Sequence, residues 1–467
     1  MAVLTFNGAA QQVTGSCYLL ESKILGRILL ECGMHQGGDA VDRIQKESFP
    51  FDPKTIDALI LSHAHLDHSG LIPTLVNHGF NAPIYCTRGT EKLLPVMLYD
   101  AAGLYERDLN YENLRRQRRG DKPLKPMYSK NDVKKALKLC QPAKYGQSVQ
   151  INGGGSLIFH DAGHILGSAI VELKIIEKET EKTLVFSGDL GKADSVLMND
   201  PAKLDAADIV LMEGTYGNRN HRSMDDTTRQ LEDILTETWK NKGNVMIPAF
   251  AVGRTQEVLF HLGCLHRDGK LDNWQVFLDS PMAIEVTNIY DECIQLLDPE
   301  DVAKLKENFQ GTLKGFLPRL RYSKTPEESM AINKISHGTI IIAGSGMCTG
   351  GRIRHHFKHR IWNQRNTIIF VGFQARGTLG RRIVDGSKMI KLFRDDISVR
   401  ARIETLGGFS AHAGQSELIE WRKHFQNNPR TILIHGEPDA LDALSMKLWQ
   451  DEAISSEIPY KGQQIFF

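Results

Sequence analysis

The sequence lacks the features that would assign it to several large classes of protein. Lys and Arg total 57 against 56 Asp and Glu, so the formal net charge of +1 indicates no overall field for nucleic acid. A local basic patch remains compatible with such a ligand. No apolar run approaches the length of a membrane helix, and neither an internal repeat nor a low-complexity tail is visible. We therefore expect a protein without a membrane segment.

Cysteine and targeting signals are also sparse. The seven cysteines are scattered, odd in number and contain no Cys-x-x-Cys pair, which indicates reduced thiols instead of a disulfide framework. Residues 1–6 lack the charged start and apolar core of a signal peptide. Both features predict a cytoplasmic protein. The length of 467 residues predicts two or three domains with a sizeable core.

The distribution of apolar runs predicts a discontinuous domain. Short strands separated by glycine turns fill the first third and resume near residues 156–187, whereas residues 91–139 have the pattern of helices and loops. Longer helices alternate with apolar strands from 218 to 397, which favours a parallel α/β layer. We predict one domain built from residues 1–217 and 398–467, with a second domain, 218–397, inserted into it.

A cluster of metal-ligand side chains follows an early predicted strand. Residues 62–68 read Ser-His-Ala-His-Leu-Asp-His, directly after the apolar run 56–61. Imidazole and carboxylate both bind zinc-class metals. Helical zinc motifs space two histidines at i and i+4, whereas the i, i+2 spacing here suits a strand end and a tight loop. The cluster predicts a metal site whose alternate side chains face two neighbouring ions.

Two ions need more than the four donors of residues 63–68, so further ligands are expected elsewhere in the chain. His164 lies in the turn Ala-Gly-His-Ile-Leu-Gly-Ser, and Asp189 in Ser-Gly-Asp-Leu-Gly, each directly beside a predicted strand. Glycine at these positions allows close approach of the backbone. Each turn alone is compatible with a purely structural role, but their order after residues 62–68 favours metal binding.

Together these motifs resemble the metallo-β-lactamase superfamily and, more narrowly, its β-CASP nucleases. The branch motifs occur in order as Met-Glu-Gly-Thr-Tyr-Gly at 212–217, Phe-Ser-Ala-His at 409–412 and Ile-His-Gly-Glu at 434–437. Between them lie similar motifs at 248–257, 279–283 and 345–347. The resemblance implies an α/β fold in which a metallo-β-lactamase αββα sandwich carries an inserted parallel-sheet α/β β-CASP domain.

The same resemblance implies two zinc ions per chain. Its pattern assigns His63, His65 and His164 to one ion, Asp67, His68 and His435 to the second, and Asp189 to both. One departure lies in the first motif, where Glu31 precedes Cys-Gly in place of the usual aspartate. We expect this acid to affect the orientation of a ligand instead of binding the metal itself.

The implied activity is hydrolysis of phosphodiester bonds in single-stranded RNA, either endonucleolytic or 5′-exonucleolytic. Two zinc ions activate a shared hydroxide for in-line attack, and the resemblance implies products with a 5′-phosphate and a 3′-hydroxyl. Asp67 is the expected orienter of the nucleophile. His412, supported by Glu213, is the candidate general acid.

The sequence identifies substrate-binding residues less specifically than metal ligands. Strand ends of the inserted domain carry candidate phosphate-binding residues: Arg254, Ser345, Arg376, Gly377 and Thr378. Ordinary strand-to-helix turns explain the same glycines equally well. The densest basic run, 115–119 with Lys122 and Lys125, is compatible with RNA contact or with a solvated helix face.

Three other functions share part of this pattern. A DNA nuclease of the Artemis-like branch resembles the chain but lacks a histidine equivalent to His435, and a noncatalytic scaffold would have lost ligands. Hydrolases of small substrates lack the inserted block. The sequence leaves the oligomeric state open, although a homodimer is common in related branches.

Overall fold

The chain forms two compact units, of which the second is inserted into the first. The computed structural model describes residues 2–35, 40–151, 154–177, 180–307 and 311–466. The first unit comprises Met1–Asp194, Asn199–Asn220 and His412–Phe467. The second comprises Ser195–Met198 and His221–Ala411. The predicted α/β class and the insertion of one domain into the other are confirmed.

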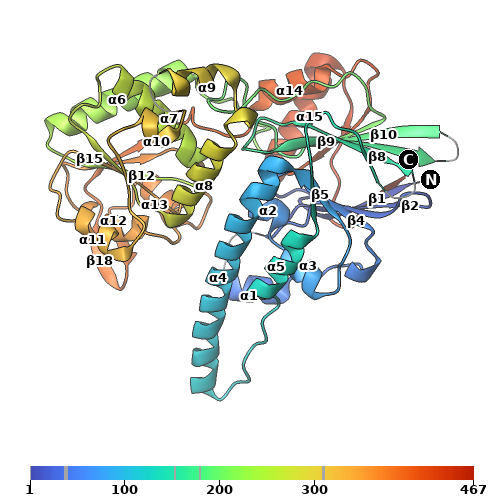
Figure 1. Ribbon diagram of the computed structural model, residues 1–467, viewed down its shortest axis with the longest axis horizontal. Helices are drawn as coiled ribbons and strands as arrows, with labels where there is room; N and C mark the ends of the chain where they lie inside the picture. Colours follow the sequence, from blue (N-terminus) through green and yellow to red (C-terminus); the bar gives the residue numbers. More distant parts are fainter. Residues whose placement is uncertain (1, 36–39, 152–153, 178–179, 308–310, 467) are drawn as a thin grey trace. The chain divides into compact units, whose positions relative to one another are not determined.

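Two seven-stranded sheets form the middle of the first unit (Figure 1). The strands of the first sheet, in spatial order, are β22 (Gln464–Phe466), β1 (Val3–Gly8), β2 (Cys17–Ser22), β3 (Gly26–Leu30), β4 (Ala58–Ile60), β5 (Ile84–Thr87) and β6 (Cys140–Ala143). Those of the second are β21 (Ser456–Glu457), β20 (Arg430–Ile434), β11 (Ile209–Glu213), β10 (Thr180–Phe186), β9 (Ala169–Glu177), β8 (Ser156–Asp161) and β7 (Val149–Gln150).

Each of the two sheets is antiparallel in one half and parallel in the other. In the first sheet β3, β4, β5 and β6 run parallel. In the second sheet β10, β11, β20 and β21 run parallel. Because parallel strands end at the same edge, the loops that follow β4, β10, β11 and β20 are placed to bring side chains together.

Alternate residues of the central strand β11 point to opposite faces of the sheet and pack in two different hydrophobic cores. Along β11, Ile209 and Leu211 belong to the core between the sheets, whereas Val210 and Met212 pack in the core on the outer face. A strand covered on both faces is expected to be apolar throughout, as β11 is up to Met212. Aromatic rings join the sheets across the inner core, where Tyr18 lies with its centroid 5.7 Å from that of Phe186.

Helices cover the outer faces of the sandwich. On the second sheet the covering helices are α14 (Gln415–Lys423) and α15 (Pro438–Glu452). Those on the side of the first sheet are α1 (Ala40–Lys46), α2 (Leu66–Ser69), α3 (Ile72–Asn77), α4 (Arg88–Arg119) and α5 (Lys130–Lys138), with a short 3₁₀ turn η1 (Pro53–Thr55). The unit is therefore an αββα sandwich.

The second unit contains a six-stranded sheet that is parallel throughout. Its strands, in spatial order, are β14 (Leu320–Tyr322), β13 (Gln275–Leu278), β15 (Thr339–Ala343), β12 (Val245–Pro248), β16 (Thr367–Phe370) and β19 (Arg402–Thr405). A hairpin of β17 (Met389–Leu392) and β18 (Asp395–Ser398) is separate from it.

Helices alternate with these strands along the chain, as right-handed parallel connections require. The helical elements are α6 (Met224–Lys240), α7 (Arg254–Arg267), α8 (Pro281–Glu292), η3 (Ile294–Leu296), α9 (Pro299–Lys306), α10 (Leu313–Phe316), α11 (Pro326–Ile332), α12 (Ile353–Arg360) and α13 (Leu379–Val384). The predicted boundary at residue 397 lies within β18. The chain stays in the second unit up to Ala411 because β19 pairs with β16.

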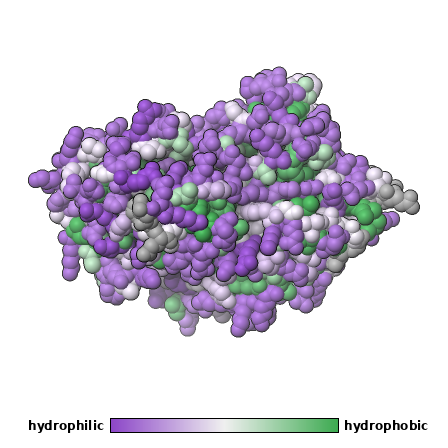
Figure 2. Space-filling view, turned by 45° about the horizontal axis from the view of Figure 1, so that its top comes forward, coloured by the Kyte–Doolittle hydropathy of each residue, from purple (hydrophilic) through white to green (hydrophobic). Residues whose placement is uncertain are grey.

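One face of the molecule can be seen to be mostly polar. On the face drawn in Figure 2, hydrophilic residues predominate and hydrophobic residues form small separate patches. No helix within the described residues is both long enough and apolar enough to span a membrane.

The packing of Phe186 between the sheets generates a test of this core. Phe186 is 2% exposed. We expect Phe186→Ala to lower the free energy of unfolding by about 3–5 kcal/mol because it leaves a cavity. Phe186→Leu retains most of the apolar volume and should cost less than half as much. Urea unfolding followed by circular dichroism measures both, and equal stabilities for all three proteins would contradict the inner-core assignment.

Candidate metal centre

The ends of the parallel strands bring imidazoles and carboxylates together in the first unit. Asp189, Glu213 and His435 follow or end the parallel neighbours β10, β11 and β20. His63 follows β4 in the other sheet. All seven residues predicted to bind metal lie in two adjoining groups that share Asp189. They are His63, His65, Asp67, His68, His164, Asp189 and His435.

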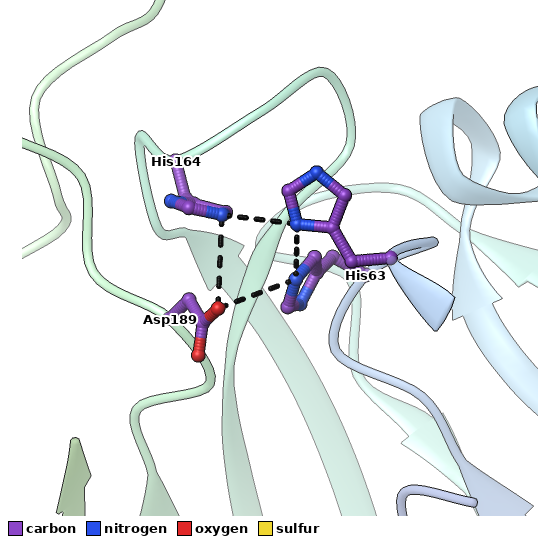
Figure 3. Close-up of side chains that lie close together, drawn as sticks. His63, His164 and Asp189 are labelled. Carbon is purple, nitrogen blue, oxygen red and sulfur yellow. Dashed lines mark hydrogen bonds and ion pairs between the residues drawn. The ribbon is translucent and has the colours of Figure 1, made fainter. Parts of the chain in front are cut away.

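The first group consists of His63, His65, His164 and Asp189 (Figure 3). His65 Nδ1 lies 3.1 Å from His63 Nε2 and 3.2 Å from His164 Nε2. Asp189 Oδ2 lies 3.5 Å from His63 Nε2 and 3.7 Å from His164 Nε2. Zinc–nitrogen bonds of 2.0–2.1 Å in a tetrahedron place neighbouring donor atoms about 3.3 Å apart. These four donors therefore fit a tetrahedral ion.

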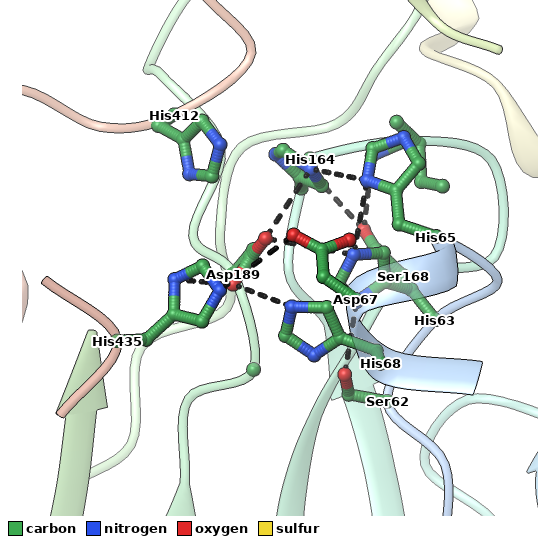
Figure 4. A network of polar contacts seen from close by, with 12 residues as sticks. Ser62, His63, His65, Asp67, His68, His164, Ser168, Asp189, His412 and His435 are labelled. Carbon is green, nitrogen blue, oxygen red and sulfur yellow. Dashed lines mark hydrogen bonds and ion pairs between the residues drawn. The ribbon is translucent and has the colours of Figure 1, made fainter. Parts of the chain in front are cut away.

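The second group uses the other carboxylate oxygen of Asp189 (Figure 4). Asp189 Oδ1 lies 3.4 Å from His68 Nε2 and 3.5 Å from His435 Nδ1. Asp67 Oδ2 lies 3.9 Å from His435 Nε2. Asp189 thus faces one set of imidazoles with each oxygen, which is the arrangement expected of a bridging ligand.

Hydrogen bonds fix the rings of His63 and His68. His63 Nδ1–H donates to Ser62 Oγ at 2.9 Å, and His68 Nδ1–H donates to Glu31 Oε2 at 3.1 Å. In each ring Nε2 is the nitrogen directed at Asp189. Such partners set both the tautomer and the orientation of a metal-binding imidazole.

Thr215 has the same relation to His435. Its hydroxyl donates to the carbonyl oxygen of His435 and accepts from His435 Nδ1–H, both at 3.1 Å. Sequence reasoning missed Ser62 and Thr215, although one adjoins His63 and the other lies in the motif at 212–217. Such residues can be sought near each predicted histidine ligand, because the ring nitrogen that does not bind metal requires a hydrogen-bond partner.

Glu31 forms hydrogen bonds to two residues of the segment that carries the proposed ligands. Its Oε1 accepts from the backbone N–H of Ser62 at 2.6 Å while Oε2 accepts from His68. The residue is fully buried and has a left-handed backbone with φ of 66°. The side chain thereby connects the loop that carries His63 to the ring of His68, as expected for an acid that orients a ligand.

The electrostatics of the centre suit a cation. His68 Nε2, His435 Nε2 and Asp189 Oδ1 are buried and form no hydrogen bond among the described residues. Buried polar atoms are rarely left so, and a metal ion would satisfy all three. Burial, aided by His68, lowers the pKa of His63 well below its usual value, which keeps the ring neutral for binding.

The carboxylate of Asp189 is ionised in this setting. Burial would raise its pKa, but the neighbouring imidazoles of His435 and His68 outweigh burial and hold the pKa well below the usual value. An ionised carboxylate 2% exposed to solvent is costly unless compensated by nearby positive charge. The residues present therefore fit a pair of metal ions.

Glycines let the loops of His164 and Asp189 approach each other. Gly163 has φ of 68°, and a Cβ on Gly191 would lie 2.0 Å from the carbonyl oxygen of Gly163. No other residue fits at Gly191 without displacing one of the two loops. The spacing of these glycines in the sequence thus reflects contact between the ligand-bearing turns.

Glu213 and His412 form a pair beside the ligands. Glu213 Oε1 lies 3.2 Å from His412 Nδ1 and accepts from the backbone N–H of Leu190 at 2.7 Å. Burial would lower the pKa of His412, but the negative charges of Glu213 and Asp189 outweigh it and raise the pKa to about 9. The His412 ring centroid lies 4.5 Å from that of His164. The pair is therefore adjacent to the first ligand group.

The predicted phosphate-binding residues all belong to the second unit. Arg254 is buried and paired with Glu257, and Thr378 caps α13 by accepting from the N–H of Arg381 at 3.2 Å. Ser345 Oγ accepts from Gly350 N at 3.2 Å within its own turn. Arg376 and Gly377 are exposed in the loop after β16. Phosphate binding by these five residues stays a prediction.

An αββα sandwich with this buried cluster defines an enzyme of the metallo-hydrolase class. Three family models match the chain: the metallo-β-lactamase superfamily at residues 11–248, the Beta-Casp domain at 255–383 and the Zn-dependent metallo-hydrolase RNA specificity domain at 396–459. The chain belongs to the metallo-β-lactamase superfamily, in the branch with an inserted β-CASP domain.

Similar proteins cover essentially the whole chain. A ribonuclease of Thermus thermophilus is 38% identical over 452 residues, which are 96% of each chain. An RNase J-like protein of Methanocaldococcus jannaschii is 31% identical over 99% of each chain. The transcription termination factor FttA of Methanosarcina mazei is 34% identical over 96% of this chain and 69% of its own.

The contact between Glu31 and His68 generates a test of ligand orientation. We expect Glu31→Gln to weaken metal binding about 10–100-fold, because loss of the charge loosens the hold on His68. Competition with a chromophoric chelator measures the affinity. Glu172→Gln is the matched control, since Glu172 accepts from His160 at 2.7 Å outside the cluster. Equal metal affinity in the two variants would contradict the role given to Glu31.

Proposed function

We propose that this protein is a zinc-dependent ribonuclease that hydrolyses phosphodiester bonds of single-stranded RNA, leaving a 5′-phosphate and a 3′-hydroxyl. The observation that carries the proposal is the buried Asp189, whose two oxygens face two separate groups of ligands. Two ions held side by side are the usual arrangement for displacement at phosphorus.

The donor set favours zinc. Five of the seven donors are imidazoles, whereas Mg²⁺ and Ca²⁺ prefer oxygen ligands. In the proposed assignment one ion is held by His63, His65 and His164 and the other by Asp67, His68 and His435, with Asp189 shared. The spacing of the first four donors, 3.1 to 3.7 Å, supports a tetrahedral site.

The chain's own residues have distinct roles in the proposed reaction. When bound, the zinc ions activate water and neutralise charge on phosphate oxygens. Asp67 has a side chain that is 16% exposed at the edge of the cluster, so its carboxylate can accept a hydrogen bond from the attacking water and orient it. Asp189, fully enclosed, holds the two ligand groups together.

Proton delivery to the leaving oxygen is assigned to His412. Glu213 anchors the Nδ1 edge of its ring at 3.2 Å, and Nε2 is the nitrogen that we assign to the leaving oxygen. Glu213 is itself held by the N–H groups of Leu190 and Thr215, so the ring is carried on a rigid support. Positioned general acids contribute about 10²–10⁴-fold to such reactions.

RNA as the substrate is supported by the comparisons. Two similar proteins are named as ribonucleases, and the model matching residues 396–459 is described as an RNA specificity domain. The relatives named transcription termination factors make a role in termination a second candidate, which would use the same RNA-cleaving centre. We retain Arg376 and Gly377, both exposed, as candidate contacts to substrate phosphates.

Removal of metal tests the proposed activity. Incubation with a chelator should abolish cleavage of RNA, and added Zn²⁺ should restore it, since the chain's residues alone supply no activated water. Separate 5′- and 3′-labelled RNAs, with matching DNA, show the end groups and the direction of cleavage. Full activity in the chelated protein, or cleavage of DNA in preference to RNA, would contradict the proposal.

The role of His412 has its own test. We expect His412→Ala to lower kcat about 10²–10⁴-fold while the zinc content is unchanged, because the ring moves a proton and binds no metal. His424→Ala, at the end of α14, is the control and should keep full activity. Loss of zinc from the His412→Ala protein would assign the ring to metal binding instead.

A further inference from the structure

The first unit contains a helical projection that the catalytic centre does not use. We call residues 106–138 the basic arm: the outer part of α4, the loop that returns from it, and α5. Figure 1 shows α4 extending well beyond the sheets of its own unit before the chain turns back. No residue of α4 after Leu109 is buried, so the outer turns contribute nothing to the core.

The basic arm is nevertheless well ordered by its own contacts. Asn113 accepts from the N–H of Leu124 at 2.7 Å and donates to its carbonyl at 3.0 Å, which ties the loop to the helix. Nearer the core, the rings of Tyr105 and Tyr128 stack with centroids 5.1 Å apart. These contacts join the returning loop to α4.

Charge is concentrated on this arm. It carries eleven Lys and Arg against five Asp and Glu, which leaves 46 basic and 51 acidic residues in the rest of the chain. The arm has a net charge of +6 and the remainder one of −5. A field of this sign attracts polyanions, and its separation from an acidic remainder directs them to the arm.

The acids of the arm are already engaged by part of its basic residues. Ion pairs join Lys130 to Glu106, Arg107 to Asp108, Arg115 and Arg119 to Glu112, Arg119 to Asp121, and Lys135 to Asp132. Among the described residues, six basic side chains of the arm form no ion pair: Arg116, Arg118, Lys122, Lys125, Lys134 and Lys138. Their charge is available to a ligand.

Apolar and amide groups lie among these cations. Tyr111 is 66% exposed and Leu114 is 55% exposed on the outer turns of α4. Asn110 and Gln117 line an open hollow of about 700 Å³ between the helix and the returning loop. Cations beside an exposed aromatic ring are the combination that binds single-stranded nucleic acid, by phosphate contact and base stacking respectively.

We infer that the basic arm is a second RNA-binding surface, which holds a single-stranded segment of the substrate outside the metal centre. Phosphates contact the unpaired basic side chains, and a base stacks on Tyr111. An acidic protein would satisfy the charge but would make no particular use of an exposed aromatic ring. The inference rests on the proposed function only in taking RNA as the polyanion.

The test is the affinity of the zinc-loaded protein for a fluorescent, unstructured phosphorothioate RNA of about 30 nucleotides, which resists cleavage. We expect Arg118→Gln/Lys122→Gln/Lys125→Gln to weaken binding at least about tenfold at 0.1 M salt and to reduce the salt slope by about 2. The matched control is Lys54→Gln/Lys144→Gln/Lys203→Gln, which removes three exposed charges from elsewhere in the same unit.

A second pair of variants tests stacking without changing charge. Tyr111→Ala should weaken binding about tenfold, and Tyr111→Phe should stay within twofold of the parent because the ring is kept. Unchanged affinity in both the triple variant and Tyr111→Ala would overturn the inference and leave the arm as a protein-binding surface. Binding is read without hydrolysis, so failure of the ribonuclease proposal, seen as no cleavage of ordinary RNA, is distinguishable.

Discussion

The arrangement of the first unit depends on the buried carboxylate of Asp189. Its Oδ2 faces His63 and His164, and its Oδ1 faces His68 and His435. One ionised group therefore connects side chains from both sheets of the sandwich. Without compensating cations such a group would be strongly destabilising, because charge is costly to bury. Bound metal ions would supply the positive charge that this buried carboxylate requires.

Side chains around the cluster orient the imidazole rings by hydrogen bonds. An imidazole binds metal through one nitrogen, so the other needs a partner that holds the ring. Ser62, Glu31 and Thr215 supply that partner for three of the histidines. Glu213 does the same for His412, which binds no metal in the proposed mechanism. A hydrogen bond to the second ring nitrogen thus orients both the proposed ligands and the proposed proton donor.

The gathering of the proposed ligands could be predicted from the sequence because each belongs to a local motif. His63 to His68 lie within one short segment, and glycines mark the turns of His164 and Asp189. The contact between Thr215 and the ring of His435 depends on the pairing of β11 with β20. No local sequence pattern indicates that these two strands are neighbours. The burial of Arg254 and the capping role of Thr378 likewise come from packing and helix geometry that composition does not reveal. The helical character of residues 91–119 was predictable, but the projection of one continuous α4 was not.

The basic arm and the metal centre separate two tasks that a ribonuclease must perform, holding a strand and cleaving it. Only cleavage depends on Asp189, whose proposed role is to join two metal ions. Anomalous diffraction at the zinc edge, from crystals of the zinc-loaded protein, tests it most directly. We predict two peaks per chain, one on each oxygen of Asp189. A single peak, or a pair of peaks that Asp189 does not join, would contradict the central claim.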